Sequence, residues 1–425
     1  MLQPLLFTLL TVGFVFGQFL RIELGNGIAI TLIDAVVGLI AVIFLLTKRK
    51  AKKEISSHPL FYPAVFFVTA CTLSLLVNSV SMQLDETFVA SLYLLRWASY
   101  LVLFYWAKNI QKTTLQKWLV IMGTGAVIFG YLQYFFYNSL KGMFQLGWDE
   151  HMYRMLGGFL DPNFAGAFYV LFFLFLLPRF LSLLSYRHSG LSRIRSWTSL
   201  STLSSRPKGQ DDIKINAMRY AYMLTTVATL IAIYLSYSRS AFLMLLVGIT
   251  VYLFLMKQKK LLFGVLIVGI GLFVLFSDPL VESKNPFRMF SSEARITSAK
   301  EAITLISKSP LIGVGFNAYR YGQRRFGLPT DEKLYASHSE AGTDNSFLFI
   351  FATTGIIGLI VFLYLQIRIL TFVRSNTGES VYLKNAKTAG LIGIFVDSVF
   401  INSLFFPMIL CWLWLTIGST GNKKP

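Results

Sequence analysis

Long apolar stretches alternate with short polar ones along the whole chain of 425 residues. A helix needs about 20 mostly apolar residues to cross a bilayer, and runs of about this length recur from the first residues to the last few. The pattern predicts an all-α polytopic membrane protein with about twelve transmembrane helices in one domain, residues 1–425. The predicted spans are residues 3–20, 28–47, 60–80, 87–107, 118–137, 163–184, 217–235, 241–256, 261–277, 346–367, 385–401 and 403–418.

Two polar stretches are too long to be simple turns between spans. Residues 185–216 are rich in Ser, Arg and Lys without a sustained apolar period, which predicts a mobile basic loop on the cytoplasmic side. Residues 278–345 form the largest loop, and the alternation of spans puts it on the outer side. Within it, Ser291 or Ser292 can cap a helix that ends at Pro310. We therefore expect short helices outside the membrane.

Composition supports lipid as the solvent. Hydrophobic residues make up 55% of the chain and charged residues only 14%, with a mean hydropathy of +0.61. An ordinary water-soluble core cannot hide that much apolar surface. The two cysteines, Cys71 and Cys411, lie inside apolar runs, so burial rather than a disulfide or a metal site is expected.

The charge of the chain follows the loops. The formal net charge is +19, which in a soluble protein would suggest a nucleic-acid partner. Here every second loop holds most of the basic residues: 25 of the 39 Lys and Arg, against four acids. The intervening loops hold 13 basic and 14 acidic residues. This positive-inside pattern places both termini in the cytoplasm and excludes a nucleic-acid role.

Ionisable residues within the predicted spans are few. They are Asp34, Arg96 and Asp397. A charge at the centre of a bilayer costs about 2.5–3.5 kcal/mol on insertion scales, so each is expected to face a neighbouring helix or a wet cavity. For Arg96, structural pairing is favoured over a role in substrate binding.

Candidate chemistry lies on the outer side. Of the four histidines only His151 and His338 are in predicted outer loops, and an imidazole is a suitable base near neutral pH. Arginines at a membrane surface offer fork-shaped donors that match diphosphate oxygens, and Arg239, Arg154 and Arg295 are the outer candidates. The sequence has no P-loop, Rossmann fingerprint, HExxH, CxxC or Asp-x-Asp motif, so no cofactor and no metal are expected.

Several short motifs resemble one family in their order and spacing, namely the bacterial O-antigen ligases and O-antigen polymerases. The motifs are RMLGGFLDPNFAG, SYSRSAF, ARITSAKEAITLISKSPLIGVGFNAY and DNSFLFIFATTGIIGL. The resemblance implies a GT-C-like membrane glycosyltransferase architecture. It also implies a metal-independent enzyme that moves a glycan from a polyprenyl diphosphate carrier to the hydroxyl of a glycan or glycolipid acceptor, on the outer face of the bacterial cytoplasmic membrane.

The resemblance also implies roles for individual residues. Arg239 and Arg295, with Arg154 as a third, would hold the donor diphosphate, and His338 would take the proton from the acceptor hydroxyl. Many relatives have a histidine directly before the asparagine of the DNSF motif, where this chain has Asp344. Asp344 is therefore an alternative base, although an exposed carboxylate near pKa 3.9 is a weak one unless burial raises it.

Two other functions stay open on the sequence. A polysaccharide or lipid transporter is compatible with the outer charged loop, although no internal repeat typical of transporters is present. A cell-wall glycosyltransferase of the shape, elongation and division group would use the same kind of lipid-linked donor. That group's motifs are not found in this chain.

Overall fold

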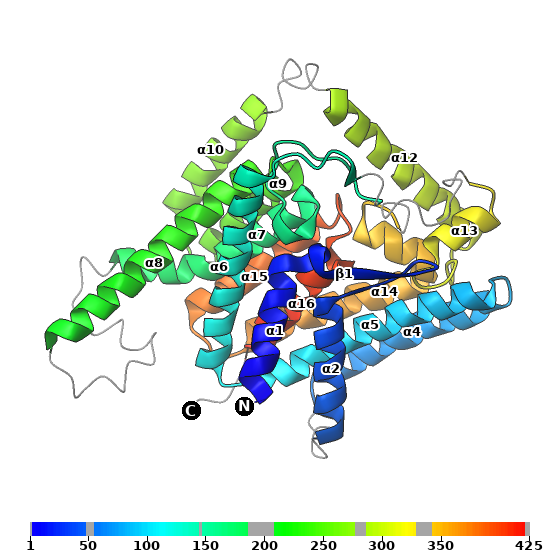
Figure 1. The fold of residues 1–425 in the computed structure, drawn as a ribbon, viewed down its shortest axis with the longest axis horizontal. Coiled ribbons are helices and arrows are strands. Elements are labelled where there is room, and N and C mark those ends of the chain that lie inside the picture. The colour runs from blue at the N-terminus through cyan, green and yellow to red at the C-terminus, as the bar shows by residue number, and fades with distance from the viewer. Residues whose placement is uncertain are drawn as a thin grey trace.

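The computed structural model describes residues 2–47, 55–143, 147–185, 208–276, 286–328 and 342–420. These ranges are mostly helical, with one small hairpin (Figure 1). In chain order the elements are α1 (Leu2–Phe16), η1 (Gly17–Leu20), β1 (Arg21–Gly25), β2 (Ile28–Thr31), α2 (Leu32–Thr47), α4 (Phe61–Ser79), α5 (Leu84–Lys108), α6 (Lys112–Phe136), η3 (Gly157–Phe159), α7 (Pro162–Ser185), α8 (Lys208–Leu235), α9 (Arg239–Leu255), α10 (Lys259–Phe276), α12 (Pro286–Lys308), α13 (Tyr319–Arg325), α14 (Ser346–Ser375), α15 (Val381–Asp397), η7 (Ser403–Phe405) and α16 (Pro407–Gly418).

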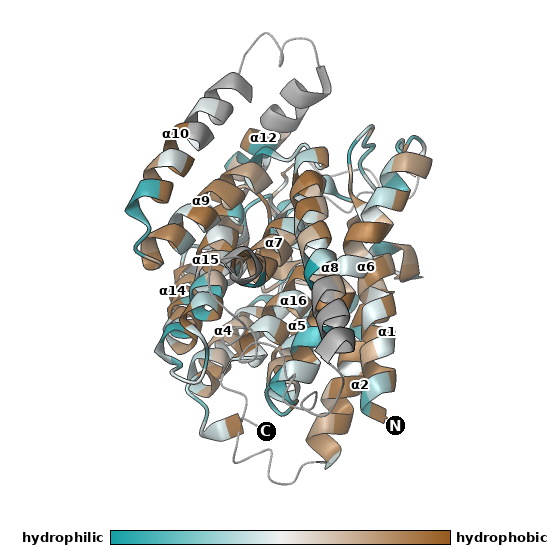
Figure 2. Cartoon of the chain, turned by 90° about the vertical axis from the view of Figure 1, so that its left-hand side faces the viewer, coloured by the Kyte–Doolittle hydropathy of each residue, from teal (hydrophilic) through white to brown (hydrophobic). Residues whose placement is uncertain are grey.

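Every predicted span lies mainly on one of these helices. Six helices of the described ranges are long and apolar enough on their own to cross a membrane, and several others are apolar but shorter. Large apolar side chains remain on the molecular surface, and hydrophobic residues dominate the helices in Figure 2. The chain is therefore a multi-pass membrane protein. The number of twelve spans and the GT-C-like architecture stay predictions.

The core is built around α7, which is the most buried of the six long apolar helices. It packs against α8, α9 and α15. Its rings at Phe168 and Phe172 lie edge-on against Trp412 of α16, with centroids 5.2 and 5.6 Å apart. Offset and edge-to-face aromatic contacts of this kind add to the stabilisation from buried area.

The start of α1 and the end of α16 lie at the same end of the molecule (Figures 1 and 2). Phe7 of α1 packs against Trp106, near the end of α5, with ring centroids 4.9 Å apart. Gly418 of α16 meets the same end of α5, where a methyl group added to it would lie 2.7 Å from Ala107 Cβ. The hairpin connects the end of α1 to the start of α2, and we call the side of the molecule on which it lies the outer end.

The hairpin corrects the prediction of an all-α chain and of a span that begins at residue 28. Residues 21–31 form an antiparallel pair in which Ile22 lies opposite Ile30, and the helix begins only at Leu32. Asn26 and Gly27 connect the strands with φ of 51° and 76°. An Asn-Gly pair with both φ positive is the favoured two-residue hairpin turn.

The long polar stretches have more structure than expected. The predicted helix of the outer loop is present as α12, which ends before Pro310 but starts at Pro286 rather than at Ser291 or Ser292. Proline is favoured in the first turn of a helix because its missing N–H would be unpaired there. Residues 208–216 of the predicted cytoplasmic loop belong to α8, while 186–207 lie outside the described residues.

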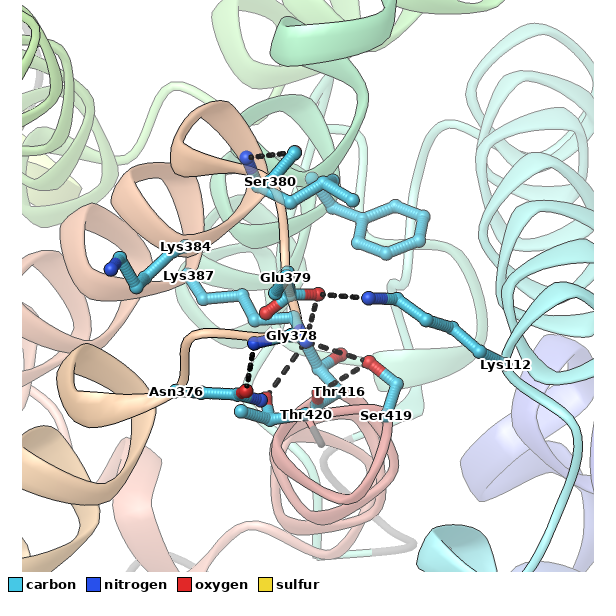
Figure 3. A network of polar contacts seen from close by, with 12 residues as sticks. Lys112, Asn376, Gly378, Glu379, Ser380, Lys384, Lys387, Thr416, Ser419 and Thr420 are labelled. Carbon is cyan, nitrogen blue, oxygen red and sulfur yellow. Dashed lines mark hydrogen bonds and ion pairs between the residues drawn. The ribbon is translucent and has the colours of Figure 1, made fainter. Parts of the chain in front are cut away.

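Figure 3 shows a buried ionic network around Glu379. The Glu379 carboxylate, fully buried, lies 2.9 Å from Lys387 Nζ and 3.4 Å from Lys112 Nζ. Lys387 also donates to Ser419 and Thr420, both at 2.8 Å. The network joins α15 to the end of α16 and to the start of α6.

Removing one member of this network is expected to destabilise the fold. Lys387→Met leaves the buried Glu379 with one lysine only, and breaking a buried pair costs about 3–5 kcal/mol. Thermal unfolding in detergent should show a lower midpoint, whereas Lys384→Met, one turn earlier on the same helix, should leave the midpoint almost unchanged. If Lys387→Met lowers the unfolding midpoint as much in the Glu379→Gln background as in wild type, the pairing of Lys387 with Glu379 does not stabilise this part of the fold.

Candidate functional site

The helix α14 is broken near its outer end, and the break organises the site. Gly355 has a φ of 65° and a ψ of −171°, which only glycine adopts readily. The segment after α12 lies along this break: Val314 N donates to Ala352 O at 2.9 Å, and Ile356 N donates to Pro310 O at 2.9 Å. Non-helical backbone inside a membrane protein is tolerated only where its polar groups are paired in this way.

Two side chains of α4 complete the junction. The Ser74 hydroxyl lies 2.7 Å from the carbonyl oxygens of both Ile312 and Thr353. Asn78 Nδ2 donates to Gly313 O at 2.9 Å. The motif SPLIGVGF is therefore a structural one, since its backbone holds the broken helix in place.

Asp344 lies directly before α14. The following residue, Asn345, caps the helix, because its Oδ1 accepts from Phe347 N and Leu348 N at 2.8 and 2.9 Å. Its Nδ2 donates to Val399 O at 2.8 Å, which ties the cap to the end of α15. Asp344 is thus held at the outer end of the molecule, with its Oδ2 4.0 Å from Arg295 Nε.

Arg239 and Arg154 lie at one turn, between α8 and α9. Arg239 is the first residue of α9 and is exposed. Arg154 donates from Nε to Ser236 O at 2.9 Å and from Nη2 to Tyr237 O at 3.2 Å. Arg154 therefore supports the turn that presents Arg239, which favours a positioning role over direct binding.

Asp397 connects this turn with Arg295. Its buried carboxylate accepts from Ser403 Oγ at 2.5 Å and is hydrogen-bonded to Ser240, the residue after Arg239. It also lies within electrostatic range of Arg295. Asp397 therefore lies beside Ser240, the residue after Arg239, and within electrostatic range of Arg295.

A cavity of about 380 Å³ opens at the outer end beside Asp344. The hairpin forms one wall, and the others come from predicted outer loops and the outer ends of helices. The ionisable side chains that share the lining with Asp344 include Asp149, His151 and Asp161 from the loop before α7, and also Arg21, Glu23, Arg96 and Arg320. None of the three arginines expected to bind the donor lines the cavity, and Asp344 connects the lining with one of them, Arg295.

The surroundings raise the affinity of Asp344 for a proton. The Asp344 side chain is half-exposed, but desolvation by the surrounding protein still raises its pKa to about 6. The charges of Asp161 and Asp149 add to this shift, and the charge of Arg295 opposes it. Burial likewise raises the pKa of Asp149 and lowers that of His151. A carboxylate with a pKa near 6 is a usable base at neutral pH, which an ordinary exposed aspartate is not.

Sequence reasoning missed much of this lining. His151 was recognised only as an outer histidine, and Asp149 and Asp161 were not singled out. The DPN motif did contain a signal for Asp161, because an aspartate before proline often caps a helix, and its Oδ1 accepts from Asn163 N at 2.6 Å. His338, the first choice as base, lies outside the described residues.

The pairing expected within the spans is confirmed. Arg96 Nε donates to Asp34 Oδ1 at 2.7 Å, and Tyr100 donates to the same oxygen at 2.8 Å. Thr31 donates to the other oxygen, Oδ2, at 2.7 Å. The pair lies directly beneath the cavity, where Arg96 and Thr31 form part of the lining.

The fold and the outer site define a multi-pass helical membrane protein with charged chemistry at one membrane face. Residues 224–363 match the family model Wzy_C, described as O-antigen ligase. This match confirms the resemblance to the O-antigen ligase family, and it contains Arg239, Arg295 and Asp344 together with the broken helix. No curated protein matches the chain.

Proposed function

We propose that the chain is a metal-independent glycosyltransferase that moves an oligo- or polysaccharide from a polyprenyl diphosphate carrier to an acceptor hydroxyl, as a ligase or as a polymerase. The observation that carries the proposal is the position of Asp344, which lines the outer cavity on one side and pairs with Arg295 on the other. The family match supports a function in polysaccharide biosynthesis.

In the proposed reaction, the acceptor hydroxyl attacks the anomeric carbon of the donor glycan. The bond between that carbon and the diphosphate oxygen breaks, and the carrier leaves as polyprenyl diphosphate with the bonding electron pair. Asp344 takes the proton from the hydroxyl as the new bond forms. Arg239 and Arg295 stabilise the negative charge that develops on the diphosphate, and inversion at the anomeric carbon is expected.

His338 is the rival base in this proposal. Its place in the outer loop shortly before Asn345 is compatible with the role. Asp344 has the support of the described geometry, because its pKa is raised to about 6 and it borders the cavity. We assign both termini to the cytoplasm and the reaction to the outer face of the bacterial cytoplasmic membrane, in agreement with the loop charges.

Loss of either donor arginine is expected to lower transfer strongly. Arg239→Ala and Arg295→Ala each remove a permanent positive charge that would stabilise the leaving diphosphate. We expect each substitution to reduce kcat by about 10²–10³-fold. The measurement is release of polyprenyl diphosphate by purified protein in detergent with a chelator present. Lys300→Ala, an exposed lysine on the same helix as Arg295, is the matched control and should behave as wild type.

The same assay tests the alternative of a polysaccharide or lipid transporter. A transferase forms product in detergent without any ion gradient. If the wild-type protein forms no product there, but moves a lipid-linked glycan across sealed vesicles in response to a gradient, the transferase proposal is wrong.

A further inference from the structure

The hairpin gives the outer cavity a wall with two different faces. Arg21 and Glu23 of β1 line the cavity, whereas Ile22 and Leu24, which alternate with them, are 66% and 62% exposed. Successive side chains of a strand point to opposite faces, so the polar face of the hairpin borders the cavity and the apolar face points away. The hairpin therefore gives the cavity a polar wall.

An aromatic side chain is fixed at the same wall. The Trp148 indole lines the cavity, and the Arg21 guanidinium lies 5.4 Å from the centroid of its ring. Trp148 also packs on the small apolar cluster of Leu140, Leu156 and Leu160, and its backbone N–H donates to Met143 O at 3.1 Å. These contacts fix the ring at the wall of the cavity, with the Arg21 guanidinium over one of its faces.

Further polar side chains border the same space. His151 and Asn402 belong to the lining, and Asp149 and Asp161 add carboxylates to it. Carboxylate oxygens accept hydrogen bonds, and the guanidinium of Arg21 on the hairpin wall donates them. The lining therefore suits a ligand that both donates and accepts hydrogen bonds.

A saccharide has the matching chemistry. A sugar ring has an apolar face of C–H groups, which packs on an aromatic ring, and a rim of hydroxyls, which both donate and accept. The cavity volume of about 380 Å³ is within the range of about 300–1,000 Å³ typical of small-molecule sites. Since acidic and basic side chains are both present in the lining, a neutral saccharide fits better than a strongly charged one.

We propose that this cavity is the binding site for the acceptor saccharide, with Trp148 as its stacking platform. The inference rests on the proposed transferase function. It assigns the acceptor rather than the donor sugar, because Asp344, the proposed base, borders the cavity while Arg239 and Arg295 do not line it. The acceptor hydroxyl then reaches Asp344 from the cavity, and the donor diphosphate lies near Arg295, which pairs with Asp344.

The kinetic test separates the two substrates. Trp148→Ala should raise the KM for the acceptor at least tenfold and leave the KM for the polyprenyl diphosphate donor within twofold of wild type. Trp148→Phe keeps an aromatic ring and the packing of the loop, so it should recover most of the acceptor affinity. Tyr137→Ala, which removes a half-exposed aromatic side chain outside the lining, is the control. A change in donor KM instead, or no change in acceptor KM, would overturn the assignment.

A binding measurement needs no turnover, so it tests the saccharide site independently of the proposed transferase function. The probes are the methyl glycosides of glucose, galactose and N-acetylglucosamine, observed by saturation-transfer difference NMR with the purified full chain. Binding of at least one probe to wild type, lost in Trp148→Ala and kept in Trp148→Phe, supports the saccharide site even if no transfer is detected. If no probe binds to wild type, or if the probes bind equally well to Trp148→Ala, the proposed saccharide site is wrong. If the wild-type protein nevertheless transfers glycan, the proposed transferase function still holds.

Discussion

Replacing Asp344 with asparagine is expected to lower the rate of glycan transfer by about 10²–10⁴-fold, the usual contribution of a general base. The amide keeps the shape of the side chain but cannot accept a proton as the carboxylate does. Binding of the donor should change little, since Arg239 and Arg295 remain. The measurement is single-turnover transfer with saturating donor and acceptor, beside Asp85→Asn, an exposed aspartate of the outer end, as the control.

The pH profile follows from the raised pKa of Asp344. The carboxylate acts as a base only when it is deprotonated, so the rate should be constant well above pH 6. It should fall about tenfold per unit as the pH drops below the pKa of about 6. A histidine base near its ordinary pKa would give a similar profile, so the profile alone does not separate Asp344 from His338.

The two substitutions separate them. If Asp344→Asn transfers at the wild-type rate and His338→Ala does not transfer, the base is His338, and Asp344 acts at most through its pairing with Arg295. If Asp344→Asn loses transfer and His338→Ala keeps it, the reverse assignment holds. Loss in both variants requires direct comparison of their donor and acceptor KM values, since a positioning residue changes KM while a base changes mainly kcat.

Replacing Gly355 with alanine is expected to destabilise the protein strongly. Its φ of 65° with an extended ψ costs a non-glycine residue about 1–3 kcal/mol, and overpacking adds about 1–3 kcal/mol. The overpacking is specific, because an added methyl group would overlap the backbone of Leu311 and Ile312. Both effects should lower the yield of folded protein and its unfolding temperature in detergent.

Gly38→Ala is the matched control for this prediction. Gly38 lies within α2, and a methyl group there would have no neighbour within 4 Å. Alanine is the better helix former, so this variant should unfold at the wild-type temperature or slightly above it. Equal unfolding temperatures for the two variants would contradict the role of Gly355 as the point where α14 is broken.

The helices could be predicted from the sequence because a bilayer requires long apolar runs, and each run of this chain became a helix. The break at Gly355 could not, since a single glycine inside an apolar run is common and has no special meaning without its partner segment. The hairpin is a different case. The Asn-Gly pair, together with Ile22 and Leu24 alternating with charged residues, is a pattern that predicts a hairpin. It lies between two long apolar runs, and the prediction of spans took precedence there.

The site was predictable only in part. The motifs predicted Arg239, Arg295 and Arg154 as donor-binding candidates and His338 as the base, with Asp344 as the alternative. General acid–base chemistry set the condition under which Asp344 would become a base. Whether burial met that condition depended on how the rest of the chain folds around Asp344, with smaller contributions from the charges of Arg295, Asp161 and Asp149. The cavity depends on side chains from separate parts of the chain, such as Arg21, Trp148 and Asn402. No local pattern relates these positions to one another.

The matched region and the cavity divide the chain in a way that bears on how such proteins diversify. Residues 224–363 hold the arginines and Asp344, whereas Arg21, Trp148 and Asn402 lie before or after that region. On the proposed assignment, the donor machinery and most of the acceptor wall are encoded in separate stretches of the gene. Changes in the hairpin or in the Trp148 loop can then alter which glycan is accepted without disturbing the handling of the carrier lipid.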